Sequence, residues 1–155
     1  MRVRTATPAD ADAIARIYNE GIDDRIATFE TAHRSPDDVR AWFTGTHPIL
    51  VVVEDGDDVD GGRVLAFAST SVYRPRDCYR GIAEFSVYVA RNARGRGAGR
   101  MAMDGLFDAA RAAGFSKLVS RVFVENVASR GLLKGVGFRE VGTYEKHGKT
   151  RRRLA

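Results

Sequence analysis

The chain has 155 residues, 44% hydrophobic and 29% charged, and this length and composition are typical of one globular domain over residues 1–155. Its 25 Lys and Arg against 20 Asp and Glu give a net charge of +5, concentrated in Arg91–Arg100 and Lys146–Arg153. Such local clusters favour an anionic ligand as readily as nucleic acid. A single cysteine, Cys78, excludes an intramolecular disulfide. No apolar run resembles a signal peptide or a membrane span, so we expect a cytoplasmic protein.

The first half of the chain predicts two helices and three strands. Met1–Ala6 alternates apolar and charged residues like a strand, and Thr7-Pro8-Ala9-Asp10 is a helix start with Thr as N-cap and Pro at the first helical position. Ser35-Pro36-Asp37-Asp38 caps a second helix. The apolar runs Ile49–Val53 and Val64–Val72 flank an acidic turn with glycines and predict an antiparallel hairpin.

The second half alternates strands and helices. The predicted elements are a strand over Ile82–Ala90, a helix from near Arg100 to Gly114, a strand over Lys117–Val124, a helix over Val127–Val136 and a strand over Phe138–Glu145. The unit from Ile82 to Val124 should be a right-handed parallel β-α-β crossover. We therefore expect an α/β fold (α+β in some schemes), with a mixed, twisted sheet flanked by helices on both faces.

An Arg/Gly loop, Arg94-Gly95-Arg96-Gly97-Ala98-Gly99, joins the strand Ile82–Ala90 to the next helix. A strand, a glycine-rich turn and a helix N-terminus make an anion site, although Arg/Gly runs are also common as solvated basic turns. The P-loop pattern is absent after this strand, and the dinucleotide pattern would need glycine at Arg100. The loop fits Arg/Gln-x-x-Gly-x-Gly/Ala and resembles the acetyl-CoA loop of the GNAT superfamily of N-acyltransferases.

The resemblance covers most of the chain and is most specific toward the phosphinothricin and arsinothricin N-acetyltransferases. The stretches that carry it are Ala27–Thr31, Tyr73–Arg76, Tyr79–Val89, Asn126–Ser129 with Gly137-Phe138-Arg139, and Tyr144–Gly148. It implies acetyl-CoA as the cofactor and acetylation of the primary amine of a small amino acid, such as phosphinothricin, arsinothricin, or methionine sulfone or sulfoximine. It also implies a resistance function and a homodimer, with neither nucleic acid nor a membrane as partner.

Two residues are candidates for catalysis. Glu84 is a carboxylate on an otherwise apolar strand, and partial burial there would raise its pKa and make it a better base for the amine proton. The resemblance also implies a catalytic Glu at this position, while the alternative is an ordinary solvent-facing residue on a half-exposed strand. His147 matches a functional histidine of the relatives, but could equally be a surface residue. We predict no metal site.

The remaining site residues follow from the resemblance. The cofactor-binding residues are main-chain groups of Val87, Tyr88 and Val89, the loop Arg94, Gly95, Arg96, Gly97, Ala98 and Gly99 with Arg100, and Asn126 and Ser129. The acceptor pocket is implied to contain Phe29, Arg74, Arg76, Tyr79 and Tyr88. Many relatives have a tyrosine that protonates the leaving thiolate, and Leu133 stands at about that position, so this role is empty here.

The C-terminus departs from the relatives. They continue with a Trp-Arg-Asp-Val-type final strand, whereas this chain ends Thr150-Arg151-Arg152-Arg153-Leu154-Ala155, so we expect an incomplete last hairpin. This departure keeps open an acyl-CoA-binding protein with weak or no catalysis. A protein N-acetyltransferase with a more open acceptor groove is a further alternative. A nucleic-acid-binding module is disfavoured by the acidic turn Glu54–Asp60 and by the absence of an RNP1 pattern.

Overall fold

In the computed structural model of the chain, the described residues are 1–24, 33–54, 63–72, 81–120 and 127–138, with only the main chain described for 127–129. A five-stranded sheet has the order β1-β2-β3-β4-β5. The strands are β1 (Arg2–Thr5), β2 (Ile49–Val53), β3 (Val64–Val72), β4 (Ile82–Val89) and β5 (Lys117–Val119). Strands β1 to β4 pair antiparallel and β4 pairs parallel with β5, which confirms the expected hairpin, crossover and mixed sheet.

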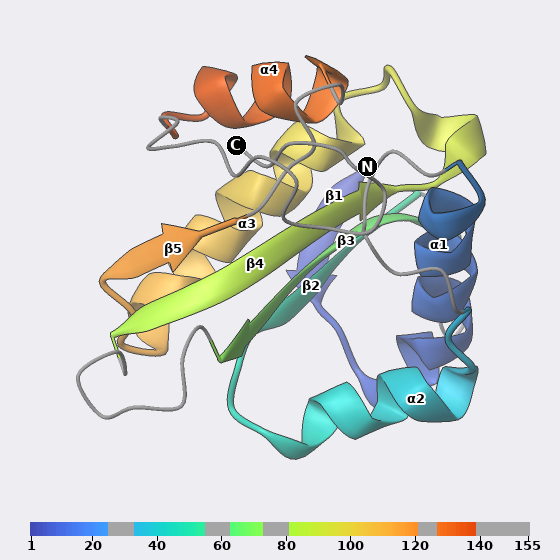
Figure 1. The fold of residues 1–155 in the computed structure, drawn as a ribbon, viewed down its shortest axis with the longest axis horizontal. Coiled ribbons are helices and arrows are strands. Elements are labelled where there is room, and N and C mark those ends of the chain that lie inside the picture. The colour runs from blue at the N-terminus through green and yellow to red at the C-terminus, as the bar shows by residue number, and fades with distance from the viewer. Residues whose placement is uncertain (25–32, 55–62, 73–80, 121–126, 139–155) are drawn as a thin grey trace, which may run out of the picture.

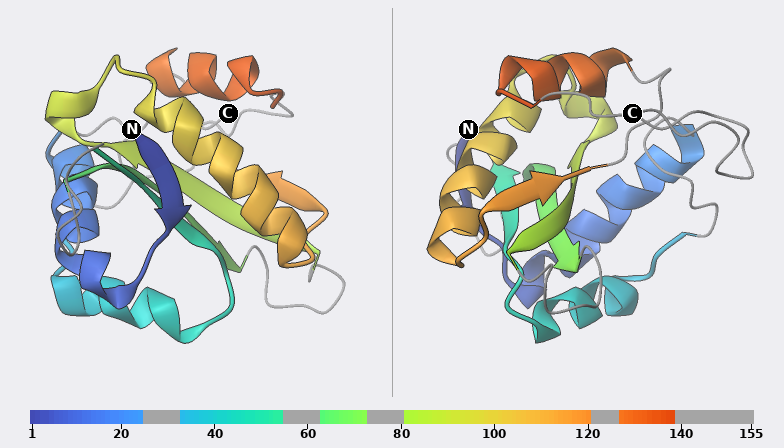
Figure 2. Two further views of the ribbon diagram at one scale, coloured as in Figure 1. Left: turned by 180° about the vertical axis from the view of Figure 1, so that it is seen from behind. Right: turned by 60° about the vertical axis from the view of Figure 1, so that its left-hand side comes forward.

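Helices cover both faces of this sheet (Figures 1 and 2). They are α1 (Ala11–Asp24), α2 (Pro36–Arg40), α3 (Ala98–Ala112) and α4 (Val127–Gly135). α1 packs on β3 and β4 from one face, and α3 crosses the other face over β1 to β4. α4 lies beside the first turn of α3 (Figure 1). None of the described helices is both long and apolar enough to cross a membrane.

Local sequence signals explain where the first two helices start. Pro8–Asp10 forms a 3₁₀ turn ahead of α1, and Ser35 caps α2 by accepting a hydrogen bond from the Asp38 N–H at 3.1 Å. α2 is shorter than expected, because the chain tightens into a second 3₁₀ turn over Ala41–Thr44. 3₁₀ turns commonly finish α-helices.

Close approach of α3 to the sheet explains a glycine within that helix. A Cβ on Gly105 would lie 2.7 Å from Val3 Cγ2 on β1. Glycine here lets the helix pack against β1, while Met103 and Leu106 on α3 are fully buried. The crossover that carries the Arg/Gly loop is therefore firmly seated on the sheet.

A buried carboxylate stabilises the start of α1 and should make folding stability depend on pH. Asp10 is 1% exposed and accepts two hydrogen bonds of 2.8 Å from the Arg4 guanidinium and one of 2.8 Å from the Thr7 N–H. Burial alone would raise the pKa of Asp10, but the bonds from Arg4 and Thr7 hold it below the usual value. A lowered pKa means that this stabilisation is complete above the unfolded value of about 4 and is lost as the pH falls through the folded value.

We therefore predict that Asp10→Asn lowers the free energy of unfolding at pH 7 by about 1.5–3 kcal/mol, the range for hydrogen bonds to charged groups. Thermal unfolding measured as a function of pH should show that the difference in stability between Asp10→Asn and the wild type narrows below about pH 4. Asp12→Asn is the matched control, because the Asp12 side chain is 76% exposed. A difference in stability that stays constant from pH 7 to pH 3 would contradict the stabilising role of the ionised Asp10 carboxylate.

Candidate cofactor loop and active site

The Arg/Gly loop joins β4 to α3 through a short 3₁₀ turn over Arg91–Ala93. Gly95 and Gly97 have φ angles of 82° and 83°, in the left-handed region, and Gly97 is the N-cap of α3. The Met101 N–H makes a helical bond of 3.1 Å to the Gly97 carbonyl. The N–H groups of Ala98, Gly99 and Arg100 precede it, so they have no acceptor within the helix and are available to an anion.

The three glycines of the loop have different roles. No atom lies within 4 Å of a Cβ built on Gly95 or Gly97, so these positions need glycine for their backbone conformation. A Cβ on Gly99 would lie 3.0 Å from Leu132 Cδ2 of α4 and 3.2 Å from Val89 Cγ2 of β4. Gly99 therefore lets α3, α4 and β4 meet closely.

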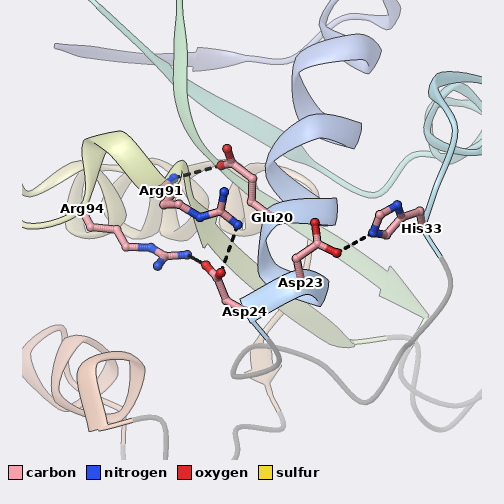
Figure 3. Close-up of polar contacts among 6 residues, drawn as sticks. All are labelled: Glu20, Asp23, Asp24, His33, Arg91 and Arg94. Carbon is pink, nitrogen blue, oxygen red and sulfur yellow. Dashed lines mark hydrogen bonds and ion pairs between the residues drawn. The ribbon is translucent and has the colours of Figure 1, made fainter.

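Carboxylates hold the arginines of this region (Figure 3). Asp24, the last residue of α1, contacts Arg91 at 3.0 Å and Arg94 at 2.7 Å, and the Glu20 side chain accepts the Arg91 N–H at 2.9 Å. Glu54, directly after β2, forms a two-bond pair with Arg96 at 2.8 and 2.9 Å. The loop is thus tied to the end of α1 and to the end of β2.

The ion pairs favour the charged forms of the two carboxylates and of two of the arginines. Hydrogen bonds from Arg91 and Arg94 lower the pKa of Asp24, and those from Arg96 lower the pKa of Glu54. The same bonds raise the pKa of Arg91 and of Arg96. The charges of Arg94 and Arg96, two of the arginines expected around the cofactor phosphates, are therefore balanced by carboxylates.

The described part of the pairing between β4 and β5 is short. Within the described residues the ladder joins Ile82–Glu84 to Lys117–Val119, and beyond it the Ser120 hydroxyl donates to the Phe85 carbonyl at 2.9 Å. The Ala90 N–H bonds to the Leu65 carbonyl on β3, so by alternation the N–H groups of Val87 and Val89 face away from β3, toward the β5 side. This orientation is compatible with the main-chain contacts to the cofactor that are expected for Val87 and Val89.

Glu84 lies at the point where the described β4–β5 ladder ends. Its partners in register are Ser71 on β3 and Val119 on β5, and its side chain is half-buried. Alternation along β4 places Glu84 on the same face as Ser86 and Tyr88, the face that α1 covers. Val87 and Val89 project from the opposite face, toward α3.

Tyr88 lies in an aromatic cluster. Its side chain is 7% exposed, and its ring centroid is 5.2 Å from that of Tyr18 on α1 and 5.1 Å from that of Phe67 on β3. Trp42 completes the cluster, 5.9 Å from Tyr18 and 6.2 Å from Phe67. A role for Tyr88 in cofactor or acceptor binding stays a prediction, and this side chain offers little accessible surface for it.

Leu133, at the position where many relatives have a tyrosine, is 9% exposed and belongs to the core.

Several of the predicted site residues lie outside the part of the chain that the structure describes. The predicted residues outside the described ranges are Phe29, Arg74, Arg76, Tyr79, Asn126 and His147, together with the side chain of Ser129. Arg100 is exposed at the start of α3, and its guanidinium lies 3.7 Å from the Cβ position of Gly135 on α4.

Sequence reasoning missed the acidic partners of the loop, Glu20, Asp24 and Glu54. One signal pointed to two of them. Carboxylates are unfavourable at the negative C-terminal end of a helix, so Glu20 and Asp24 in the last two turns of α1 should each have a partner. The identity of that partner was hidden, because it lies 67 to 71 residues further along the chain.

The loop geometry fits a diphosphate group of coenzyme A. The N–H groups in the first turn of α3 lack helical acceptors and follow two left-handed glycines, and the N–H groups of Val87 and Val89 face the β5 side of β4. Among the described residues, no group of three His, Cys, Asp or Glu side chains is placed to hold a metal ion.

Comparison with known proteins gives a consistent assignment. The model of the acetyltransferase (GNAT) family matches residues 14–138. A phosphinothricin N-acetyltransferase of Streptomyces coelicolor is 32% identical, covering 96% of this chain and 88% of the relative. An L-methionine sulfoximine/L-methionine sulfone acetyltransferase of Pseudomonas aeruginosa is 34% identical, covering 88% and 78%.

Solved structures share the whole fold. A ribosomal-protein-alanine N-acetyltransferase from Brucella melitensis superposes with a TM-score of 0.90 at 30% identity, covering 99% of this chain and 96% of the other. A phosphinothricin acetyltransferase from Sinorhizobium meliloti in complex with acetyl-CoA gives a TM-score of 0.84 at 28% identity, covering 98% and 84%. The chain therefore belongs to the acetyltransferase (GNAT) family, as an N-acetyltransferase that uses acetyl-CoA.

Proposed function

We propose that this enzyme acetylates the primary amine of a small amino acid that bears a second anionic or strongly polar group, of the phosphinothricin or methionine sulfoximine type. The observation that carries the proposal is the identity of 32–34% over 88–96% of the chain with relatives named for these two acceptors. The predicted pocket arginines, Arg74 and Arg76, would pair with the acceptor's second anionic group.

We further propose that the Arg/Gly loop binds the diphosphate of acetyl-CoA and that β4 aligns the rest of the cofactor. The N–H groups of Ala98, Gly99 and Arg100 would donate to phosphate oxygens. Those of Val87 and Val89 would face the pantetheine arm and the acetyl carbonyl, whose developing negative charge they would stabilise. The supporting geometry is two separate sets of donors, the N–H groups in the first turn of α3 and those of Val87 and Val89 on β4.

For the chemistry, we propose that Glu84 removes a proton from the acceptor amine, directly or through one water. Acetyl-CoA supplies the acetyl group as a thioester. The amine nitrogen forms the new C–N bond as the C–S bond breaks, and the amine proton passes to Glu84. Leu133 has no proton to donate, so that position supplies no general acid for the departing thiolate, a loss that is tolerable for a stable leaving group. His147 remains a second candidate for proton transfer.

Protein N-acetylation is the second candidate function. The observation that favours it is the TM-score of 0.90 with the ribosomal-protein-alanine N-acetyltransferase. A thiol-release assay with acetyl-CoA tests both functions, using phosphinothricin, methionine sulfoximine and methionine sulfone against a peptide with a free N-terminal alanine. We expect turnover of the amino-acid analogues and little of the peptide. The reverse preference would establish the second function, and acetyl-CoA binding without any turnover would favour a binding protein.

We also propose a homodimer, as the resemblance implies. Light scattering of the purified protein would show about twice the chain mass of 17.0 kDa. A monomer at micromolar concentration would contradict it.

A further inference from the structure

The end of α1 carries three carboxylates, and each has a specific partner (Figure 3). Glu20 accepts the Arg91 N–H, Asp24 contacts both Arg91 and Arg94, and Asp23 contacts His33 at 2.7 Å. Carboxylates at this end of a helix oppose the helix dipole. Glu20 and Asp24 reach across to the segment that follows β4, so this end of α1 is shaped to hold the start of the cofactor loop.

We propose that Asp24 is a positioning residue for cofactor binding, and this inference rests on the proposed role of the Arg/Gly loop. Arg91 and Arg94 flank the 3₁₀ turn that leads from β4 into the loop. One carboxylate contacts both guanidinium groups, at 3.0 and 2.7 Å, so it fixes both ends of this turn. Glu20 fixes the main chain of Arg91 directly.

Arg94 is close in sequence to the N–H groups that would bind the diphosphate, so a restraint on Arg94 limits where those N–H groups can lie. Gly95 follows Arg94 directly, and Gly97 caps α3 two residues later. A Cβ built on either glycine would meet no atom within 4 Å. Ala93 is buried in the core, and Asp24 adds a further restraint to the segment before Gly95, as Glu54 does for Arg96.

The direction in which acetyl-CoA affinity changes when Asp24 loses its charge separates a positioning role from simple electrostatics. Asp24 is a negative charge near a site for a negative ligand, and its lowered pKa keeps it ionised at neutral pH. Coulomb repulsion alone predicts that removing this charge tightens acetyl-CoA binding. Competition between Asp24 and phosphate for Arg94 predicts the same tightening. Positioning predicts weaker binding, because the loop loses its preorganised conformation.

The test compares Asp24→Asn with Asp12→Asn, which removes the same charge from the first turn of α1, where the side chain is 76% exposed. KM and kcat are measured for acetyl-CoA and for acetyl-pantetheine, which lacks the diphosphate. We expect Asp24→Asn to raise KM for acetyl-CoA by about three- to tenfold, the range for two partly exposed ion pairs, with kcat little changed. In Asp24→Asn, KM and kcat for acetyl-pantetheine should be unaffected. Asp24→Glu should reverse part of the rise in KM for acetyl-CoA, and Asp12→Asn should behave as the wild type.

The outcomes are distinct. A lower KM for acetyl-CoA in Asp24→Asn, or an equal loss with both thioesters, would overturn the positioning role. A wild type that prefers acetyl-CoA together with an unchanged Asp24→Asn variant would overturn this inference and leave the proposed cofactor site standing. A wild type that uses the two thioesters equally well would overturn the proposed cofactor site, and the inference with it.

Discussion

Replacing Glu84 with Gln is expected to lower kcat by about 100- to 10,000-fold, the range for loss of a positioned general base. Gln keeps the size of the side chain and its place at the end of the described β4–β5 ladder, but it cannot accept the amine proton. The KM for acetyl-CoA should change little, because the proposed diphosphate donors lie beyond the other end of β4. Steady-state thiol release with the best acceptor, together with titration of acetyl-CoA by calorimetry, measures both quantities.

Asp108→Asn is the matched control, since it removes an exposed carboxylate from α3. It should leave kcat within about twofold of the wild type, as expected for a surface substitution. If Glu84→Gln also keeps near-normal turnover, the base lies elsewhere, and His147 becomes the candidate to replace next.

Gly97→Val should weaken acetyl-CoA binding with less effect on kcat at saturation. Gly97 has a φ of 83°, and a left-handed conformation costs a residue with a Cβ about 1–2 kcal/mol. If the bound state needs this conformation, that strain corresponds to a rise in Kd of about five- to thirtyfold. Because no atom lies within 4 Å of the added Cβ, a steric clash is not the cause.

Gly131→Ala is the control for adding a Cβ to a glycine. Gly131 lies within α4, and its Cβ would also meet no atom within 4 Å, but its φ is not in the left-handed region. Alanine should raise the free energy of unfolding by about 0.5–1 kcal/mol and leave acetyl-CoA affinity unchanged. Equal affinities for Gly97→Val and the wild type would show that the left-handed turn is not needed for binding.

Much of the fold could be predicted because its signals are local. The Thr7-Pro8 and Ser35-Pro36 starts, the hairpin and the crossover each follow from residues a few positions apart. The early end of α2 was not predictable. Apolar periodicity continues past that point, and the break depends on how neighbouring segments pack.

The candidate site could be predicted in part. Spacing and composition indicated the Arg/Gly loop as a candidate anion site and singled out Glu84 as an unusual carboxylate. Alternation could place Glu84 and Tyr88 on one face, but burial of Tyr88 requires knowing that Tyr18 and Phe67 meet it there. The pairing of Asp24 with two arginines joins segments 67 and 70 residues apart, and no local pattern encodes it.

A crystal structure of the protein with coenzyme A would test the proposed cofactor site directly. We predict diphosphate oxygens within about 2.7–3.2 Å of the main-chain N–H groups of Ala98, Gly99 or Arg100. The pantetheine arm should lie along the side of β4 toward which Val87 and Val89 direct their N–H groups. A diphosphate bound instead by the basic segment Lys146–Arg153, away from the start of α3, would contradict the assignment.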